Sequence, residues 1–280
     1  MKKAAILATI LILIGVIGSL FTFKSSNNKD TVLDEKVIET NDFKHIKVET
    51  DNANIKVKST KDDKASITLI GNESSTLTDN VEDTILHIQS KAEQEKLFSL
   101  DFFPKELELT VSLPEEIYDT IEVSSHNGYI SMEKLAAEHF NLHTENGRVN
   151  LDTIQGETIK LYSNNGKIEA NDVIADELDL LADNGKIALT NIEASIIGKS
   201  NNGKITLDQK TLQHRTELHS DNGKIDVILD EKPIHILYDL VSHNGKITVF
   251  GEESWDIQVG DGKPLLKLSS NNGKITIGDK

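Results

Sequence analysis

The chain has 280 residues, of which 37 % are hydrophobic and 5 % aromatic, and its formal net charge is −16. This composition favours an elongated domain over one with a large globular core. An acidic surface repels phosphate chains and no basic stretch is interleaved with aromatic residues, so we expect no nucleic-acid partner. Cysteine is absent, which excludes a disulfide framework and a thiolate metal site.

The N-terminus carries a membrane signal. Lys2 and Lys3 precede an uncharged, mostly apolar run over residues 4–23, which is long enough to cross a hydrocarbon core of about 30 Å. A cleaved signal peptide is the competing interpretation, but its apolar region is shorter and ends in small residues. We expect a cytoplasmic stub at 1–3, an uncleaved transmembrane signal anchor at 4–23, and an extracellular remainder, as the positive-inside rule indicates.

A polar linker is expected at 24–41, and degenerate β-coils are expected at 42–118. Residues 46–57 have the frame of the later repeats with Ala53 in place of glycine, so we interpret them as a first, atypical coil. Further strands are predicted near residues 67–70, 85–88 and 107–113, because apolar and polar residues alternate there.

Residues 119–280 form a repeat array marked by eight Asn-Gly dipeptides. Successive glycines are 19, 19, 19, 18, 20, 22 and 28 residues apart. The dipeptides are Asn127-Gly128, Asn146-Gly147, Asn165-Gly166, Asn184-Gly185, Asn202-Gly203, Asn222-Gly223, Asn244-Gly245 and Asn272-Gly273. Such a step indicates that one supersecondary unit is stacked many times.

Each unit is predicted to be a strand, a sharp bend and a second strand. Residues seven and five positions before the glycine, and two and four after it, are mostly apolar and should face a core, as Ile121, Val123, Ile130 and Met132 do in the first unit. The residue three positions before the glycine is small and usually carries a hydroxyl group. We attribute the glycine to its tolerance of positive φ.

Two all-β architectures fit this unit. As a hairpin turn, Asn-Gly would produce a long antiparallel meander. As a corner, it would produce a single-stranded parallel β-helix with coils of about 19 to 20 residues. The near-constant step favours the parallel β-helix, in which identical residues of successive coils lie over one another, and stacked asparagines can form hydrogen-bonded ladders.

The chain resembles a bacterial β-strand-repeat family labelled "putative adhesin" or LiaG-like. The resemblance rests on the N-terminal anchor, residues 42–50 and 111–118, and the serial Ser-x-Asn-Gly-x-Ile units. It implies an extracytoplasmic β-solenoid, in some members linked to the envelope stress response, and it supplies no catalytic residue. The family commonly has Ser-Gly-Asp-Ile at the bend, so the Asn-Gly-Lys-Ile of this chain changes the charge of that edge.

The residue after each glycine is the main candidate for binding. In a solenoid these residues form one column with a spacing of about 5 Å. The candidate binding residues are Arg148, Lys167, Lys186, Lys204, Lys224, Lys246 and Lys274, preceded by Tyr129. A basic stripe could bind an anionic cell-wall polymer or glycan. The alternative is that lysine is a soluble corner residue that guards against edge pairing.

Other candidates have less support. The apolar cluster Leu97, Phe98, Leu100, Phe102 and Phe103 fits a contact patch or, preferably, a cover over the N-terminal end of the solenoid. Asp183 and Asp221 would lie two coils apart, farther than an inverting carboxylate pair. The histidines show no metal-ligand spacing, so we expect neither a metal nor a cofactor.

The sequence therefore predicts a single-pass cell-membrane protein with an extracellular β-solenoid. Its expected function is non-catalytic binding or adhesion at the cell envelope, with an anionic polymer, a glycan or an envelope protein as partner. The alternatives are a polysaccharide-degrading enzyme of the β-helix type and a structural or regulatory envelope scaffold.

Overall fold

The computed structural model describes residues 32–40, 42–71, 75–92, 107–253 and 258–279. The expected anchor at 4–23 and the cluster from Leu97 to Phe103 lie outside these ranges. In the part of the chain that is described, no helix is long and apolar enough to span a membrane. The chain divides into two compact units, and the second, Leu33–Lys280, holds nearly all of the described residues.

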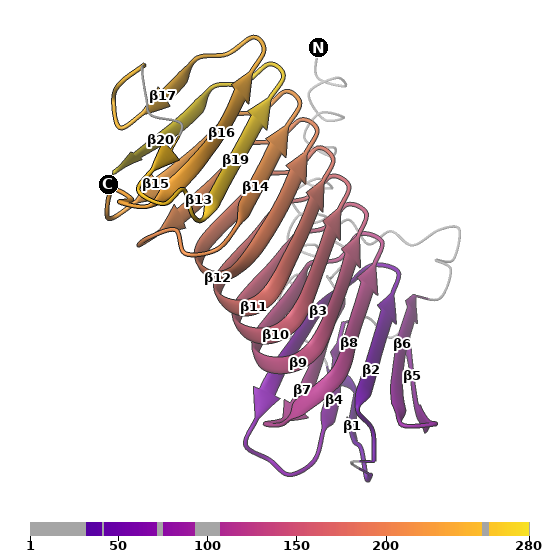
Figure 1. Ribbon diagram of the computed structural model, residues 1–280. Helices are drawn as coiled ribbons and strands as arrows, with labels where there is room; N and C mark the ends of the chain where they lie inside the picture. The colour runs from indigo at the N-terminus through magenta and orange to yellow at the C-terminus, as the bar shows by residue number, and fades with distance from the viewer. Residues whose placement is uncertain (1–31, 41, 72–74, 93–106, 254–257, 280) are drawn as a thin grey trace, which may run out of the picture. The chain divides into compact units, whose positions relative to one another are not determined.

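The described residues form twenty β-strands and no helix (Figure 1). The strands are β1 (Val32–Val37), β2 (His45–Thr50), β3 (Ala53–Thr60), β4 (Ser66–Ile70), β5 (Ser75–Glu82), β6 (Ile85–Ala92), β7 (Leu107–Pro114), β8 (Ile117–Ser125), β9 (Ile130–Thr144), β10 (Val149–Ser163), β11 (Ile168–Ala182), β12 (Ile187–Ser200), β13 (Ile205–Gln209), β14 (Thr216–Ser220), β15 (Ile225–Leu229), β16 (Ile236–Ser242), β17 (Ile247–Val249), β18 (Gln258–Val259), β19 (Leu265–Ser270) and β20 (Ile275–Asp279). Strand β1 lies inside the segment 24–41 that the sequence suggests is a linker.

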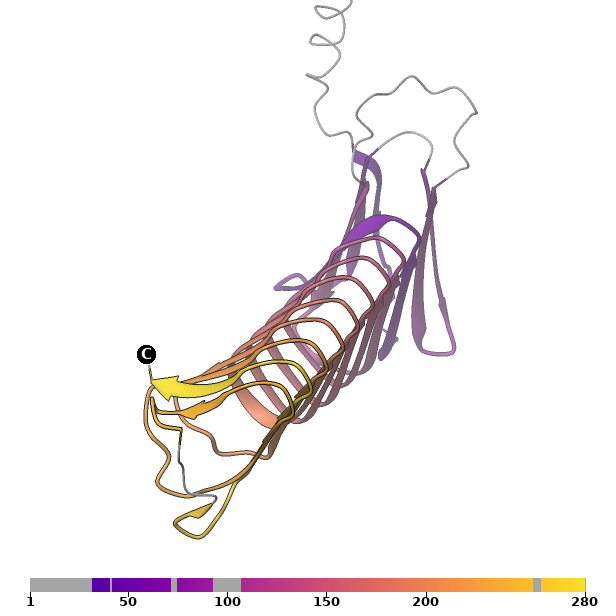
Figure 2. The ribbon, with the colours of Figure 1, turned by 90° about the horizontal axis from the view of Figure 1, so that it is seen from above.

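Successive repeats pair in parallel, one coil apart. Strands β9, β10, β11 and β12 lie side by side, with Val149 opposite Ile168 and Ile168 opposite Ile187. Figure 2 shows the resulting row of bends from above. Parallel pairing between repeats confirms the all-β solenoid and excludes the antiparallel meander, because a hairpin would pair the two arms of one repeat with each other.

Each long strand turns a second corner that the sequence did not predict. Lys134, Thr153, Asp172 and Asn191 occupy equivalent positions in β9 to β12 and have φ values of 56, 58, 53 and 53°. Left-handed conformations are uncommon outside glycine and asparagine. The corner persists because the pairing on both sides of it fixes the path of each coil.

The core lies between the strands before and after each bend. The expected inward residues are buried: Ile121, Val123, Ile130 and Met132 are at most 1 % exposed. The same columns continue through the array, so one apolar core runs along the stack. Successive side chains along each strand point alternately to this core and to solvent, as the sequence pattern predicts.

Glycine is required at the bends for a reason other than the one expected. None of the eight bend glycines has a positive φ; among the described residues, the glycines that do are Gly251, Gly260 and Gly262. Instead, a Cβ atom built on Gly166 would lie 1.5 Å from the carbonyl oxygen of Gly147 in the preceding coil, and other bend glycines show contacts of 1.5 to 2.0 Å. The close stacking of the bends therefore leaves no room for a side chain at the glycine position.

The first coil in the sequence is not the first coil in space. Strands β2 and β3 pair in parallel with β8 and β9 on one side and with β6 and β7 on the other. The stretch around Ala53 thus packs directly against the first Asn-Gly repeat, and a later part of the chain lies beyond it. Strands β4 and β5 add antiparallel pairing to β7 and β6 at this end.

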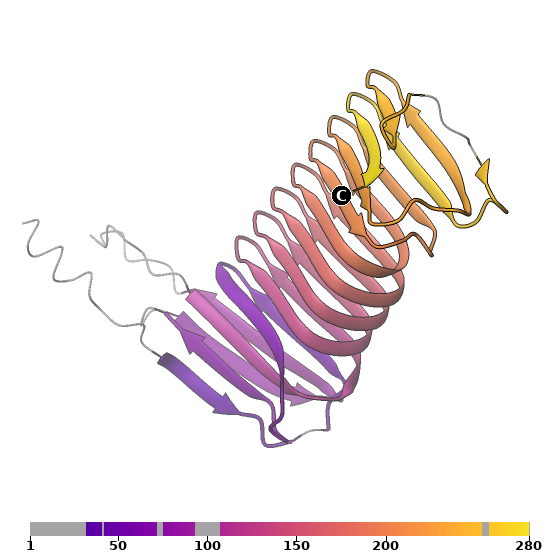
Figure 3. The same cartoon turned by 90° about the vertical axis from the view of Figure 1, so that its left-hand side faces the viewer.

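The C-terminal coil is likewise inserted. Strand β19 lies between β14 and β16, and β20 lies between β15 and β17. Figure 1 shows this order at the yellow end of the chain, and Figure 3 shows it from the side. The expectation that coils stack in sequence order is therefore wrong for the last two units, since the eighth bend lies between the sixth and the seventh.

The close approach at the bends generates a stability prediction. Replacing Gly166 with alanine should lower the free energy of unfolding by about 3 kcal/mol or more, because the new Cβ overlaps a backbone carbonyl that cannot rotate away. Gly278→Ala is the matched control, since its Cβ meets nothing within 4 Å. Urea unfolding of the two variants measures the difference; equal stabilities would refute the steric explanation.

Candidate functional site

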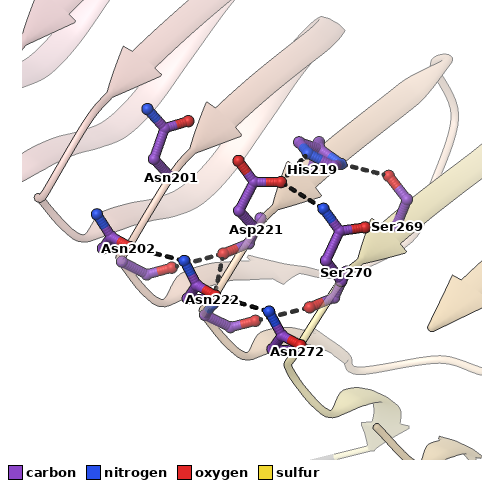
Figure 4. Close-up of polar contacts among 12 residues, drawn as sticks. Asn201, Asn202, His219, Asp221, Asn222, Ser269, Ser270 and Asn272 are labelled. Atoms are coloured by element: carbon purple, nitrogen blue, oxygen red, sulfur yellow. Dashed lines mark hydrogen bonds and ion pairs between the residues drawn. The ribbon is translucent and has the colours of Figure 1, made fainter. Parts of the chain in front are cut away.

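Two side-chain ladders hold the bends in register. Each bend asparagine donates its Nδ2 to the Oδ1 of its neighbour in the adjacent coil, as Asn222 does to Asn202 and Asn272 does to Asn222, both at 2.8 Å (Figure 4). In most repeats the hydroxyl three residues before the glycine donates to the carbonyl oxygen of the bend glycine in the adjacent coil, as Ser220 Oγ does to Gly203 at 3.0 Å. These ladders fix where the next residue, the candidate cation, emerges.

The structure brings all seven candidate cations into one column. The carbonyl oxygen of each cation accepts a hydrogen bond from a backbone N–H of the adjacent coil. Ile130 donates to Arg148, Val149 donates to Lys167, and the series ends with Ile275 donating to Lys246. The inserted coil changes the order at the end, so Lys274 lies between Lys224 and Lys246. The placement predicted from the repeat is therefore found, with this one exchange.

Most of these cations are paired with carboxylates. Arg148 and Lys167 both contact Glu169, and Lys246 lies 2.5 Å from Glu253. Among the described contacts, Lys186 and Lys274 have no ion pair. The column is therefore a chain of partly neutralised charges, which reduces the repulsion between like charges one strand apart.

One pair of lysines surrounds a buried carboxylate. Lys204 Nζ and Lys224 Nζ lie 2.8 and 3.0 Å from Asp226 Oδ2, and the Asp226 side chain is 13 % exposed. Desolvation by burial opposes the charged form, yet hydrogen bonds from both lysines lower the pKa of Asp226 below its usual value. The arrangement stabilises the stack locally and pairs two cations of the column with one carboxylate, although both lysine side chains remain partly exposed.

A groove crosses the outer face of the strands that precede the bends. It has a volume of about 870 Å³ and spans six coils, from β2 and β8 through the second halves of β9 to β12. One outward column of its lining runs Ser124, His143, Tyr162, Leu181 and Lys199 in adjacent coils. The groove therefore runs across the strands, along the stacking direction.

The floor of the groove combines aromatic, apolar and charged groups. The rings of His143 and Tyr162 stack with centroids 4.7 Å apart and planes inclined by 5°. Leu181 and Ile197 continue this surface and are 37 % and 44 % exposed. Along its length are three lysines and three acidic residues, namely Lys47, Lys160, Lys199, Glu49, Glu122 and Asp179. Its net charge is balanced, unlike that of the basic column.

A serine, a histidine and an aspartate meet beyond the C-terminal end of the groove. His219 Nδ1 lies 2.7 Å from Ser269 Oγ, and His219 Nε2 lies 3.1 Å from Asp221 Oδ1 (Figure 4). This order resembles a nucleophilic triad. However, Ser269 pairs in parallel with strands on both sides, so its backbone amide is used in the sheet and cannot stabilise an oxyanion.

The carboxylates considered for hydrolysis are also separated. Asp183 accepts a hydrogen bond from Asn201 at 3.1 Å, and Asp221 accepts one from Asn271 at 2.6 Å. Asn201 lies in the coil between them, as the repeat predicted. Within the described ranges, no group of three or more His, Asp or Glu residues is arranged to hold a metal ion.

Sequence reasoning missed the groove and the buried Asp226. A signal for the groove was present, because Tyr162, Leu181 and Ile197 occupy outward positions that are polar in most repeats. Exposed apolar side chains at polar positions of a strand are informative when they fall in neighbouring coils. The burial of Asp226 had no such signal, since an aspartate at an outward position is ordinary.

Comparison with known proteins identifies a family and a fold. The family model described as Toastrack DUF4097 matches residues 43–278. A search of curated proteins found no significant match. Among solved structures, a "putative adhesin" from Bacteroides fragilis is similar to 88 % of this chain over 96 % of its own, with 14 % identity and a TM-score of 0.52. This likeness supports the fold alone.

Two structures from Parabacteroides distasonis are less similar. One, named a "putative adhesin", covers 91 % of this chain and 98 % of its own, with 15 % identity and a TM-score of 0.49. The other, named a "putative lipid binding protein", is similar to 90 % of this chain over 97 % of its own length, with 15 % identity and a TM-score of 0.46.

The buried carboxylate predicts a pH-dependent stability. Because its folded pKa is below the unfolded value, Asp226 contributes stability above about pH 4, and this contribution is lost as the pH falls through the folded pKa. Asp226→Asn should cost about 2 kcal/mol at pH 7 and little in strong acid. Asp239→Asn, which removes an exposed pair with Lys267, should cost less than about 1 kcal/mol. Urea unfolding across pH tests both; a pH-independent loss would contradict the ion-pair explanation.

The basic column can be tested without disturbing its ion pairs. Lys186→Gln with Lys274→Gln should leave the unfolding midpoint unchanged, because neither lysine has a described ion pair. If the column binds an anionic polymer, this variant should lose about tenfold in affinity for teichoic acid at low salt. A second variant, with Lys167, Lys186, Lys204 and Lys224 all changed to Gln, should lose more affinity, but it also removes the ion pairs of Lys167, Lys204 and Lys224. Unchanged retention of both variants in a pull-down would remove the column as a binding site.

Proposed function

The chain belongs to the Toastrack DUF4097 family, and from that premise we propose that it is a non-catalytic binding module displayed at the cell envelope. The module is anchored by residues 4–23, with its N-terminus inside and the solenoid outside the membrane. It binds an elongated carbohydrate in the groove over β2 and β8 to β12. We include in this proposal an association with the envelope stress response, which rests on the resemblance to LiaG-like proteins.

The groove is the observation that supports this function. It extends across six coils in the stacking direction, so a chain-like ligand would meet equivalent positions at intervals of about 4.8 Å. The stacked rings of His143 and Tyr162 and the exposed side chains of Leu181 and Ile197 form a partly apolar surface, against which the C–H groups of a sugar can pack. Flanking lysines and carboxylates supply hydrogen-bond donors and acceptors for hydroxyl groups.

The charge of the groove indicates the class of carbohydrate. Lys47, Lys160 and Lys199 are balanced by Glu49, Glu122 and Asp179, and Lys47 lies 3.1 Å from Glu49. A strongly anionic chain would gain little from such a surface and would be repelled by the net charge of −16. A neutral or zwitterionic glycan fits better, while an anionic polymer would depend on the separate column of lysines.

Binding should depend on the aromatic floor. Tyr162→Ala in the full-length protein in detergent should weaken binding to envelope polysaccharide about tenfold, equivalent to about 1.4 kcal/mol, because the stacking surface is lost. Isothermal titration or a glycan array measures the change.

Tyr129→Ala is the matched control for this experiment. Tyr129 also lies on the outer surface, but it belongs to the column after the bend and does not line the groove. Equal binding by wild type, Tyr162→Ala and Tyr129→Ala would contradict the groove as the site. Shortening of the polysaccharide during incubation would instead favour a polysaccharide-degrading enzyme.

A further inference from the structure

The Asn-Gly bends carry a chemical liability of their own, separate from ligand binding. In this dipeptide the glycine nitrogen is unhindered. After losing its proton it can attack the asparagine Cγ, forming the C–N bond of a five-membered succinimide as ammonia leaves. Water then opens the ring to aspartate or isoaspartate, so one water is consumed and one ammonia released. Eight such dipeptides occur in the chain.

The asparagine ladder restrains this reaction in most bends. The side-chain amide of Asn165 donates to Asn146 Oδ1 at 2.7 Å, and its own Oδ1 accepts from Asn184 at 2.9 Å. Seven of the eight asparagines are held on both sides in this way. A side chain bonded on both sides cannot turn its Cγ toward the following glycine nitrogen without breaking the ladder.

The hydroxyl ladder restrains the attacking nitrogen. In five bends the glycine N–H donates to the hydroxyl three residues earlier, at 2.8 to 3.0 Å. These glycines are Gly128, Gly147, Gly166, Gly203 and Gly223. The bond holds the proton that the nitrogen must lose and fixes the orientation of the amide.

Three bends lack this second restraint. Gly185 follows Ala182, which has no hydroxyl group. For Gly245 and Gly273, the described contacts include no bond from the glycine nitrogen to Ser242 or Ser270, whose hydroxyls donate to the carbonyls of Gly273 and Gly223.

Asn244 also lacks the first restraint. Its coil is the last of the stack, so its Nδ2 donates to Asn272 at 2.8 Å, while no described residue donates to its Oδ1. Gly245 is exposed. The strand that follows, β17, has three residues; among the described strands it pairs along its length with β20, and its last residue, Val249, also forms one bridge to Glu252. Short strands at the end of a stack open locally at low free energy.

We propose that Asn244 is a site of spontaneous deamidation, and that the folded protein sets a graded order of rates. Asn244 reacts first, Asn184 and Asn272 follow, and the five doubly restrained asparagines react last. The product changes the end of the stack. A carboxylate at position 244 faces Asn272 Oδ1 with no proton between them, and isoaspartate adds a backbone carbon that shifts β17 out of register with β20.

Site-resolved mass spectrometry tests the order of rates. Full-length protein in detergent is incubated at mildly alkaline pH in ¹⁸O-labelled water, and each Asn-Gly peptide is followed. We expect Asn244 to react at least about tenfold faster than Asn165, which corresponds to a difference of about 1.4 kcal/mol in local opening. In urea the eight rates should converge, because only the fold separates them.

Ala182→Ser is the matched control for the hydroxyl ladder. It supplies the hydroxyl that Gly185 lacks, at a position where four other repeats carry serine within 2.8 to 3.0 Å of the glycine nitrogen. The variant should slow Asn184 to the rate of Asn165 and leave Asn244 unchanged. Uniform rates in the folded protein would overturn the proposal for Asn244, and an unchanged rate at Asn184 would overturn the role of the hydroxyl.

Discussion

The structure depends on the close stacking of one bend upon the next. A carbonyl oxygen of each coil occupies the place where the Cβ of the following bend residue would lie, so only glycine permits the spacing of paired strands at this corner. Once the bends stack, asparagine amides and serine hydroxyls bond from coil to coil, and the apolar columns align over a continuous core. Register is fixed because a slip of one residue would turn every core side chain outward.

The same constraint explains how the ends of the stack can be built from inserted coils. Every coil presents the same parallel edge, so a coil from either end of the sequence can occupy an interior place. This happens at both ends of the stack. Strands β2 and β3 lie one coil inward from β6 and β7, and β19 and β20 lie one coil inward from β16 and β17. The coils that come first and last in the sequence are thereby held by neighbours on two sides.

Stacking also converts single residues into surfaces. A lysine repeated once per coil becomes a column, but Glu169 and Asp226 neutralise part of it. A few aromatic and aliphatic residues at outward positions become the floor of a groove that crosses six coils. In a solenoid, one outward residue in neighbouring repeats therefore matters more than an isolated cluster, and the character of a surface follows from the whole column.

The sequence by itself determined the repeat, the strands on either side of each bend, the inward columns and the alignment of the seven cations. These follow from period 2 alternation and from a repeat length of 18 to 20 residues in the regular part of the array. Ile130 and Met132 were predicted to be buried, and they are. The role of glycine was misassigned, because a close approach between coils cannot be seen within one repeat.

Only the tertiary structure decided the order of the terminal coils, the left-handed corner at Thr153 and its equivalents, the burial of Asp226 and the groove at Tyr162. Each of these depends on which coil lies beside which, and on what covers an outward position. A local pattern reports the direction of a side chain from its own backbone. It does not report the neighbour across the sheet when every coil offers an equivalent edge, and that choice is made by non-local pairing.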